Sequence, residues 1–569
     1  MHDLVIRGGT LIDGTGAPAR TADVAVDGGR ISEVGRVGGA AKRSVDADGL
    51  AVTPGFVDIH THYDGQATWD PLLAPSCYHG VTTLVMGNCG VGFAPVKPDQ
   101  HAFLIELMEG VEDIPGTALH EGISWEWETF PQYLDALAKR RFALDVATQV
   151  PHGAVRAYVM GERGAKNEPA KPEDIAAMAA IVKEGVAAGA LGFSTSRTIA
   201  HRAISGEPVP GTFAAEDELF GIGRAMGSLG RGIFEVAGAG SAGEDVAAPK
   251  AELDWMKRLS KEIGRPVTFA LLQVDAAPAL WRELLDLSAA AAKEGAQVFP
   301  QVAGRPFGML VGHQTKIHPF ALRPSFDALA ALPFAERIHR LRDPETKRKI
   351  LAEGKTAPRS MLLSILHKFF PIGDPPRYEP TREESIAGIA EREGRDPEEL
   401  LYDRMLARDG KELFLVPVLN YSEGSCDPIR EMMLHPFAAL GLGDGGAHCG
   451  IICDASIQTF VLTHWVRDRT RGAKLPVEFA VRRMTRDTAA LYGFADRGTV
   501  APGQRADLNL IDLAGLRLEP PAMVQDLPAG GQRFMQRAHG YRATFVGGEQ
   551  TIANDEPTGA LPGRLVRGK

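Results

Sequence analysis

Two histidines two residues apart, His60 and His62, follow the apolar run that begins at Pro54. On an extended strand, residues i and i+2 point to the same side, so both imidazoles can reach one metal ion. A thiol follows the next apolar run, at Cys89, between glycines that allow the backbone to turn sharply. Imidazole and thiolate are ligands that zinc prefers. We therefore predict a zinc site, although Cys89 taken alone could equally be a buried apolar residue.

A carboxylate holds a comparable position late in the chain. Asp444 comes directly after an apolar run and before two glycines. There it can bind a metal ion or accept a proton from an activated water, and its alternative role is to cap the next helix. His448, four residues further on, could supply a proton or orient that carboxylate, or face solvent as an ordinary loop residue.

Several other side chains are weaker candidates. Glu235 is a further possible metal donor, and His152 either hydrogen-bonds a ligand or packs in the core. Arg305 and Arg197 each follow a strand-like run, and either guanidinium could hold a substrate carboxylate. Two tryptophans line the edge of the site or pack in the core: Trp125 and Trp127.

The elements that must position these residues are apolar runs that alternate with Ala/Leu/Glu-rich helical stretches, a pattern typical of parallel strands with helical crossovers. Eight such units predict a TIM-type (β/α)8 barrel, in which catalytic groups lie at the C-terminal ends of the strands. The run 413–420 is also strand-like, so whether it or the run ending at Val302 forms the seventh strand stays open. The eight strands are expected to end near His62, Asn88, His152, Ser196, Val236, Gln273, Val302 and Asp444.

The remaining sequence predicts a second, composite domain. Residues 1–53 alternate short β-type runs with glycine turns and predict a small antiparallel sheet. Residues 496–569 have the same character, so the two ends are expected to close one β-sandwich domain around a barrel at 54–495. Within the barrel, residues 305–410 form an insertion too long for a barrel loop. We expect a lid over the substrate there, the alternative being a subdomain without that role.

Composition excludes several classes of partner. The 569 residues carry a net charge of −10 and no basic run, so nucleic acid and anionic membranes are not expected partners. Five cysteines, an odd number, do not resemble a disulfide framework and indicate a reducing compartment. No run of 18 apolar residues and no signal-peptide core is present, so we expect a cytoplasmic protein. The oligomeric state stays open, a homo-oligomer included.

Longer motifs make the sequence resemble the amidohydrolase superfamily and, within it, the N-acyl-D-amino-acid deacylases. The resemblance runs through most of the chain. Its motifs are PGFVDIHTHYDGQATWDP at 54–71, HGVTTLVMGNCGVGFAP at 79–95, VEDIPGTAL at 111–119, VPHGAVRAYVMG at 150–161, GALGFSTS at 189–196 and AVRRMTRDTAALYGFADRGTVAPGQRADLNLID at 480–512.

The resemblance implies a metal-bearing barrel with a β-domain built from both termini, and metal roles for His60, His62, Cys89 and Asp444. Family members hydrolyse amide bonds through activated water. They also carry a histidine after strand five and a second one, followed by lysine, after strand six. This chain has no histidine between positions 201 and 313. We therefore expect a divergent site that holds one tightly bound zinc per chain.

The sequence thus predicts a metal-dependent hydrolase of a small-molecule amide, with N-acyl-D-amino acids as the leading substrate class. Zinc on His60, His62 and Cys89 would polarise the amide carbonyl, while Asp444 takes a proton from water and passes it to the leaving nitrogen. One alternative is a different amidohydrolase reaction, such as opening a cyclic amide. Another is a binding protein with a degraded metal site. Metal content tests the latter, and acetyl-D- against acetyl-L-amino acids tests the former.

Overall fold

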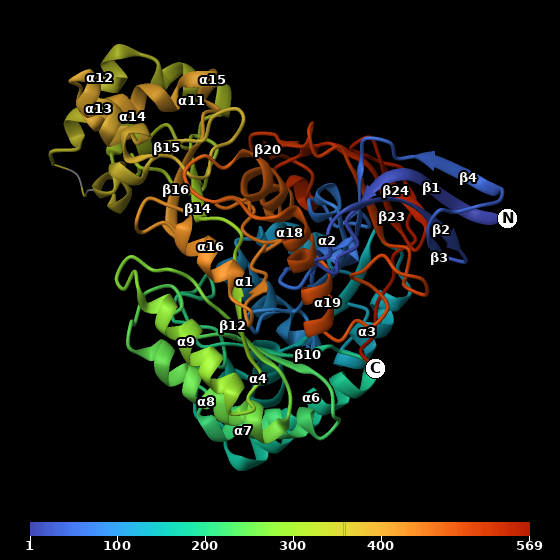
Figure 1. Cartoon of the computed structure of the whole chain (residues 1–569). Helices are drawn as coiled ribbons and strands as arrows, with labels where there is room; N and C mark the ends of the chain where they lie inside the picture. The colour runs from blue at the N-terminus through green and yellow to red at the C-terminus, as the bar shows by residue number, and fades with distance from the viewer. Residues whose placement is uncertain (357, 359) are drawn as a thin grey trace.

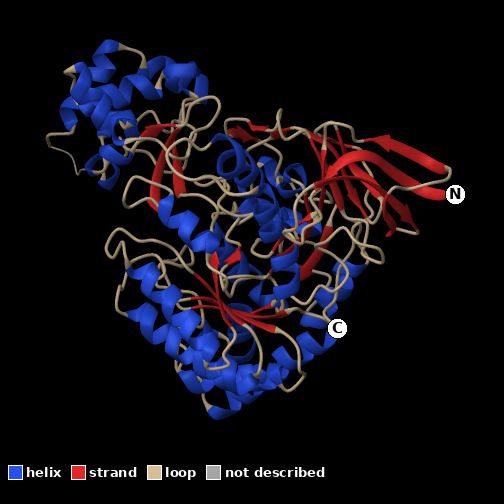
Figure 2. Ribbon diagram, viewed as in Figure 1, coloured by secondary structure: helices blue, strands red, loops and turns tan. Residues whose placement is uncertain are grey.

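Parallel strands alternate with helices through the middle of the chain in the computed structural model, which describes residues 1–356, 358 and 360–569. Two sheets contain these strands, one in the order β6-β7-β8 and one in the order β17-β13-β12-β11-β10-β9. Helices lie outside the strands (Figures 1 and 2). The strands are β6 (Phe56–Asp58), β7 (Val81–Met86), β8 (Asp145–Thr148), β9 (Val150–Pro151), β10 (Gly192–Ser196), β11 (Ile233–Ala237), β12 (Val267–Ala270), β13 (Val298–Val302) and β17 (Ala439–Leu440).

The apolar runs of the sequence became strands because both of their faces are covered. All six residues of β7 are buried, and all five of β10 and β11. The helices that cover them bury one face and expose the other. For example, α8 (Ala248–Ile263) buries Leu253, Trp255, Met256 and Leu259 among exposed charged residues. This arrangement confirms an α/β fold. The other helices of this layer include α3 (Phe130–Ala138), α4 (His152–Met160), α6 (Pro172–Ala188), α7 (Glu216–Gly227), α9 (Leu280–Lys293), α18 (Val477–Met484) and α19 (Arg486–Leu491).

The structure resolves which run is the seventh strand. β13 pairs in parallel with β12 on one side and with β17 on the other. The competing run contains β16 (Phe414–Leu419), which is antiparallel to β14 (Phe307–Val311) and β15 (Phe370–Pro371) in a separate sheet. The run ending at Val302 therefore takes the seventh place, and the run 413–420 belongs to the insertion.

One sheet of nine strands joins the two ends of the chain. β5 (Ala51–Pro54) pairs antiparallel with β18 (Leu508–Ile511), so blue and red strands lie side by side in Figure 1. The expectation of an antiparallel sheet is wrong in part, because β1 (His2–Leu11) pairs in parallel with β4 and β5. Two further sheets of two strands each lie within residues 517–539, and a sandwich of two layers stays a prediction. The other strands are β2 (Arg20–Asp27), β3 (Arg30–Gly35), β4 (Ala41–Asp46), β23 (Tyr541–Val546), β24 (Glu549–Ala553) and β25 (Glu556–Pro557).

The insertion forms a helical unit with its own core. It projects from the rest of the molecule at the upper left of Figure 1. β14 and β16 pair as its stem, and helices lie between them. A separate hydrophobic cluster, which includes Ile338, Leu341, Leu400 and Leu401, holds the unit together. Its helices are α10 (Pro324–Asp327), α11 (Phe334–Leu341), α12 (Pro344–Glu353), α13 (Ile386–Glu393), α14 (Pro397–Met405) and α15 (Ala407–Gly410).

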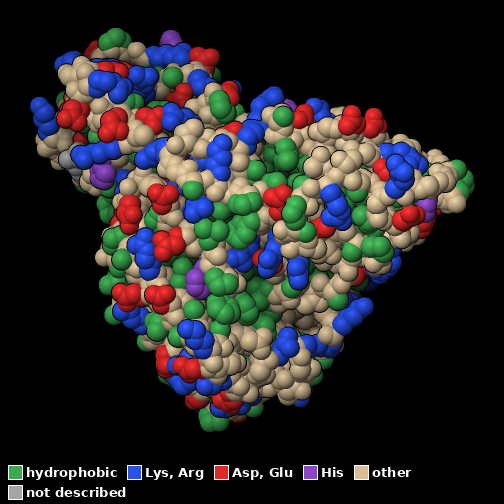
Figure 3. Space-filling view, viewed as in Figure 1, with side chains coloured by type: hydrophobic (Ala, Val, Ile, Leu, Met, Phe, Trp, Pro, Cys, Tyr) green, Lys and Arg blue, Asp and Glu red, His purple; other side chains and the backbone are tan. Residues whose placement is uncertain are grey.

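The surface carries charges of both signs. Lys and Arg side chains are interspersed with Asp and Glu side chains over the face drawn in Figure 3. In the part of the chain that the structure describes, no helix combines the length and the apolar character needed to cross a bilayer.

Candidate metal centre

His60 and His62 lie on an extended segment just beyond β6 rather than on the strand itself. Thr61 pairs in parallel with Gly445, and the His62 amide donates to the Gly445 carbonyl at 2.8 Å. Both imidazoles therefore keep the common direction that a strand would give them, and their ring centroids lie 5.4 Å apart. Each histidine is 1% exposed.

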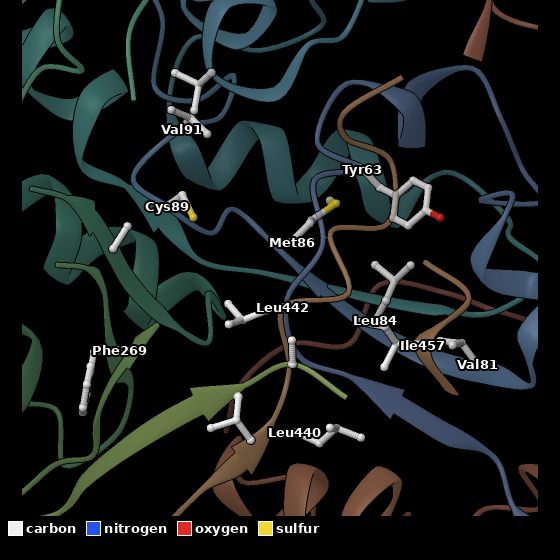
Figure 4. Close-up of a cluster of buried hydrophobic side chains, with 14 of the residues drawn as sticks. Tyr63, Val81, Leu84, Met86, Cys89, Val91, Phe269, Leu440, Leu442 and Ile457 are labelled. Carbon is white, nitrogen blue, oxygen red and sulfur yellow. The ribbon is translucent and has the colours of Figure 1, made fainter. Parts of the chain in front are cut away.

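Cys89 reaches the same point from the loop after β7. Its backbone is left-handed, with φ +54°, and its amide donates to Oε2 of Glu235 at 2.9 Å. The next residue must be glycine, because a Cβ on Gly90 would lie 2.7 Å from the amide nitrogen of Ser196. This turn brings Sγ to 3.3 Å from Nε2 of His60. Figure 4 shows Cys89 on that loop, beyond the packed side chains of Leu84, Met86, Leu440 and Leu442.

Asp444 completes the group from the segment after β17. Its backbone is also left-handed, with φ +46°. Oδ1 lies 3.5 Å from Nε2 of His60 and 3.7 Å from Nε2 of His62. The donor atoms of His60, His62 and Cys89 all lie within 4.8 Å of one another. Four ligands at roughly 2.0–2.3 Å from a tetrahedral ion are about 3.3–3.8 Å apart, so the three short separations fit one such ion.

A hydrogen bond at the far side of the His60 ring leaves its Nε2 free to bind a cation. Nδ1 of His60 lies 2.9 Å from Oε1 of Gln301, whose amide nitrogen donates to Thr268 Oγ1. Gln301 therefore accepts, His60 donates through Nδ1, and Nε2 keeps its lone pair. Nδ1 of His62 is buried without a hydrogen bond and lies 3.3 Å from Oε1 of Glu112.

The four candidate metal donors have strongly shifted pKa values, because they are buried close together. Burial lowers the pKa of His60 to about 4. Burial also disfavours charge on His62, but Glu112 and Asp444 outweigh it and raise its pKa to about 9. Burial favours the neutral form of Asp444, yet the hydrogen bond from His62 and the charges of the nearby histidines hold its pKa well below the usual range. Burial and Glu235 keep the pKa of the Cys89 thiol well above its ordinary value.

Glu235, the expected additional donor, lies on β11 at the edge of this group. It is fully buried, and Oε1 has no hydrogen-bond partner among the described residues. Burial raises its pKa to about 8. A buried carboxylate oxygen without a partner is costly, which is consistent with a nearby cation. Its role as a ligand stays a prediction.

Two further residues of the site were missing from the sequence predictions. Glu112, at the end of α1 (His101–Glu112), lies inside the VEDIPGTAL motif, which was the only signal for it. His201 follows β10, and its Nδ1 lies 3.0 Å from Ser196 Oγ. Burial lowers the pKa of His201 to about 3, and the charges of His448 and His62 add to that effect, so it lies within electrostatic reach of the centre.

His448, a sequence candidate, does lie at the site. Its Nε2 is 3.9 Å from Oδ2 of Asp444 and 3.8 Å from Oε2 of Glu112. Its side chain is 23% exposed, against 10% for Asp444 and 2% for Glu112. The structure therefore places His448 on the open side of the buried donors.

His152 has both ring nitrogens engaged within the protein. Nδ1 lies 2.8 Å from Thr195 Oγ1, and Nε2 lies 2.8 Å from Glu218 Oε1. Glu218 is held in turn by Arg156. Because the ring is fully buried and has no free nitrogen, this arrangement supports the packed-core alternative over contact with a ligand.

The two arginines expected to hold a substrate are also engaged. Arg305 is 1% exposed, and its guanidinium bonds Asp454 through Nε at 3.1 Å and Ser456 through Nη1 at 2.8 Å. Arg197 pairs with Glu252 at 2.9 Å and donates to the Ala214 carbonyl. These contacts do not support a role in substrate binding, because each charge is neutralised by a carboxylate far away in sequence.

The two tryptophans pack with other aromatic rings. Trp127 is buried and donates from Nε1 to the Phe93 carbonyl at 2.7 Å. Trp125 stacks on the imidazole of His101 at 3.9 Å. These contacts agree with the alternative of core packing.

Comparison with known proteins points to one family. The profile described as "Amidohydrolase family" matches residues 43–552. D-aminoacylase from Alcaligenes xylosoxydans xylosoxydans is 29% identical over 577 residues, which cover 99% of this chain and 97% of that protein.

Two solved structures are similar over the full length of both chains. One is a D-aminoacylase structure on the functional role of the binuclear metal centre of that enzyme, with a TM-score of 0.65 and 25% identity, covering 100% of each chain. The other is N-acyl-D-glutamate deacylase from Bordetella bronchiseptica, complexed with zinc and a phosphonate inhibitor that mimics the tetrahedral intermediate. It has a TM-score of 0.64 and 24% identity, covering 100% of this chain and 99% of that one.

Proposed function

Because the chain belongs to the amidohydrolase family, we propose that it hydrolyses a C–N amide bond with the help of a metal ion held by His60, His62 and Cys89, and that its substrates are N-acyl-D-amino acids. The observation that carries the reaction class is the convergence of two Nε2 atoms, one thiol and one carboxylate at spacings that suit one tetrahedral ion. The similarity to D-aminoacylase along 99% of the chain supports the substrate class.

The donor set suits zinc. A bound zinc ion supplies a Lewis acid that polarises a carbonyl and lowers the pKa of water. His60 and His62 would hold it through Nε2, and Gln301 fixes the orientation of the His60 ring. Strands five and six offer Glu235 and Gln273 but no histidine, so the two imidazoles that the family resemblance implies there are missing. We therefore propose one tightly bound zinc per chain.

Asp444 moves the proton in this proposal. Oδ1 faces the two imidazoles, while Oδ2 faces His448 at the accessible side. Its low pKa keeps it ionised at neutral pH, so it can accept a proton from the attacking water and deliver it to the leaving nitrogen. His448 lies where it can hold the carboxylate in that direction.

The proposal includes a closed barrel under a lid. The Thr61–Gly445 pairing connects the first strand segment with the last, which supports closure of the eight parallel strands. The insertion contacts the loop that carries His448, because the Leu310 amide donates to the Ile451 carbonyl at 2.7 Å. A segment in that position can cover the mouth of the barrel and select substrates.

The experiment is a comparison of optical isomers with zinc-loaded protein. We expect release of free amino acid from several N-acetyl-D-amino acids and at least about 100-fold slower release from the L-isomers, since a misplaced reacting group costs that much. Asp444→Asn, loaded with zinc in the same way, is the control for contaminating activity. A zinc-loaded protein that hydrolyses no N-acyl-D-amino acid, or prefers the L-isomers, would overturn the substrate assignment.

A further inference from the structure

We propose that Glu112 is a positioning residue. It orients His62 on one side and holds the loop of His448 on the other, and so keeps His62 and Asp444 in the positions that the metal centre needs. The inference rests on the proposed function only in that the centre binds a metal ion. It concerns how the protein prepares that centre, whichever amide is the substrate.

The end of α1 turns the Glu112 side chain toward the site. The next residue, Asp113, adopts the left-handed conformation with φ +52°, which ends the helix. Asp113 then faces away from the donors: Oδ2 accepts from the Gly450 amide at 2.9 Å, and Oδ1 pairs with Lys316 of the insertion at 2.8 Å. Glu112 itself is 2% exposed. The two neighbouring carboxylates thus have different contacts: Glu112 faces the metal centre, and Asp113 faces Gly450 and the insertion.

Inside, Glu112 fixes which nitrogen of His62 can bind a cation. Oε1 lies 3.3 Å from Nδ1, and Nε2 is the atom directed toward Asp444 and the other donors. A carboxylate beside one ring nitrogen keeps a proton there and leaves the other nitrogen for the metal. Gln301 takes the corresponding place at His60, where it hydrogen-bonds Nδ1 at 2.9 Å, so each imidazole has its own neighbour beside Nδ1.

On the other side, Glu112 holds the strand-eight loop. The amide of His448 donates to the Glu112 carbonyl, and Nε2 of His448 lies 3.8 Å from Oε2. His448 and Asp444 both have left-handed backbones, with φ +54° and +46°. Such residues keep their conformation only when their surroundings hold them. Glu112 is part of those surroundings for His448.

The burial of Glu112 needs a reason of this kind. Among the described residues, its side-chain ion pairs are with His62 and His448, and none is with lysine or arginine. A buried carboxylate without a strong cationic partner costs stability. We therefore assign the buried carboxylate of Glu112 a role toward the two groups that it faces, His62 and His448.

The test measures zinc affinity with zinc alone, by competition with a chelating dye, in three variants. Glu112→Gln keeps the length and one acceptor oxygen, Glu112→Asp keeps the charge but not the reach, and Glu112→Ala removes both. We expect zinc affinity to fall about 10–100-fold in Glu112→Ala and Glu112→Asp, the usual cost of losing an orienting partner, and less in Glu112→Gln. Glu106→Gln, on the exposed face of the same helix, should match the wild type.

A second readout separates positioning from a general loss of structure. At saturating zinc, kcat of Glu112→Ala and Glu112→Asp should fall by a larger factor than KM rises, and Glu112→Gln should keep part of the wild-type kcat. Circular dichroism and Tm show whether each variant is folded. If Glu112→Ala fails to fold, Glu112→Gln and Glu112→Asp provide the test. The proposal is overturned if both of these variants bind zinc as tightly as the wild type, or if Glu112→Asp keeps more of the zinc affinity than Glu112→Gln does. Because zinc affinity is measured without substrate, failure to hydrolyse N-acyl-D-amino acids would count against the proposed function alone.

Discussion

The sulfur of Cys89 lies 3.3 Å from Nε2 of His60, although the two residues follow different strands. A thiol can donate a weak hydrogen bond to a neutral imidazole, and burial keeps both of these groups neutral. The two proposed ligands are therefore already in contact. A zinc ion held by both would take the place of the proton between them, without a large movement of the chain.

Removal of that thiol should remove the metal. After dialysis against a chelator, we expect about one zinc per chain in the wild type and a small fraction of that in Cys89→Ala, because a lost ligand costs more than the roughly 10–100-fold of a lost outer partner. Elemental analysis measures this. Cys77→Ala, which removes another buried thiol, is the control and should keep its zinc. Full retention by Cys89→Ala would contradict the assigned ligands.

Loss of basicity at Asp444 should stop catalysis without unfolding the protein. Asn has the same shape and tolerates the left-handed backbone at this position. We expect kcat/KM of zinc-loaded Asp444→Asn to fall by at least about two orders of magnitude, the usual range for a general base, with Tm little changed. Turnover at the wild-type level would exclude Asp444 as the proton acceptor.

Zinc affinity should rise with pH. In the metal-free protein the pKa of His62 is raised to about 9, and that of Cys89 lies well above its ordinary value, so both groups are protonated between pH 6 and 8. Zinc must displace these protons, so its affinity falls as the pH is lowered and rises as it is increased, by up to about 100-fold per pH unit if two protons leave. Titration calorimetry in buffers of different ionisation enthalpy counts the protons. A pH-independent affinity would show that His62 and Cys89 are not both protonated before zinc binds.

Trimming the insertion should change substrate selection before it changes metal binding. Helices α10, α11 and α12 pack in the separate cluster of the insertion, so they can be replaced by a short turn. Residues 368–380 must stay, because Phe370, Ile372 and Tyr378 pack in the main core. We expect KM or the preferred acyl group to change while zinc stoichiometry stays the same. An unchanged substrate profile would show that the insertion is no lid.

Asp454 should matter for stability, through Arg305. Removal of one partner leaves an uncompensated charge, which costs about 3–5 kcal/mol in buried pairs. Urea unfolding of Asp454→Asn should show a loss of this order. Arg258→Ala, at an exposed ion pair, should stay within about 1 kcal/mol of the wild type. If Asp454→Asn is as stable as the wild type but has a raised KM, Arg305 binds substrate after all.

The convergence of His60, His62, Cys89 and Asp444 was predictable, because ligand-type residues stood where apolar runs ended and strand ends meet at one face of a parallel sheet. Glu112 was not, because nothing in the helical pattern of residues 101–112 says that its last side chain turns toward another segment. The ion pair of Arg305 was not predictable for a related reason: its partner, Asp454, is 149 residues away. The two runs that competed for the seventh place both read as strands, and their pairing partners distinguish them.

The pairing of β5 with β18 has a consequence for how the protein is made. Val52 and Leu510 lie opposite each other and share one hydrophobic cluster, yet more than 400 residues separate them in the sequence. A ribosome that adds about 5–20 residues per second needs on the order of half a minute to a minute and a half for that interval. During this time β5 has an open edge and uncovered apolar side chains, which are a template for wrong pairing. Slow or interrupted translation should therefore favour aggregation, and co-expressed chaperones should raise the yield of soluble protein.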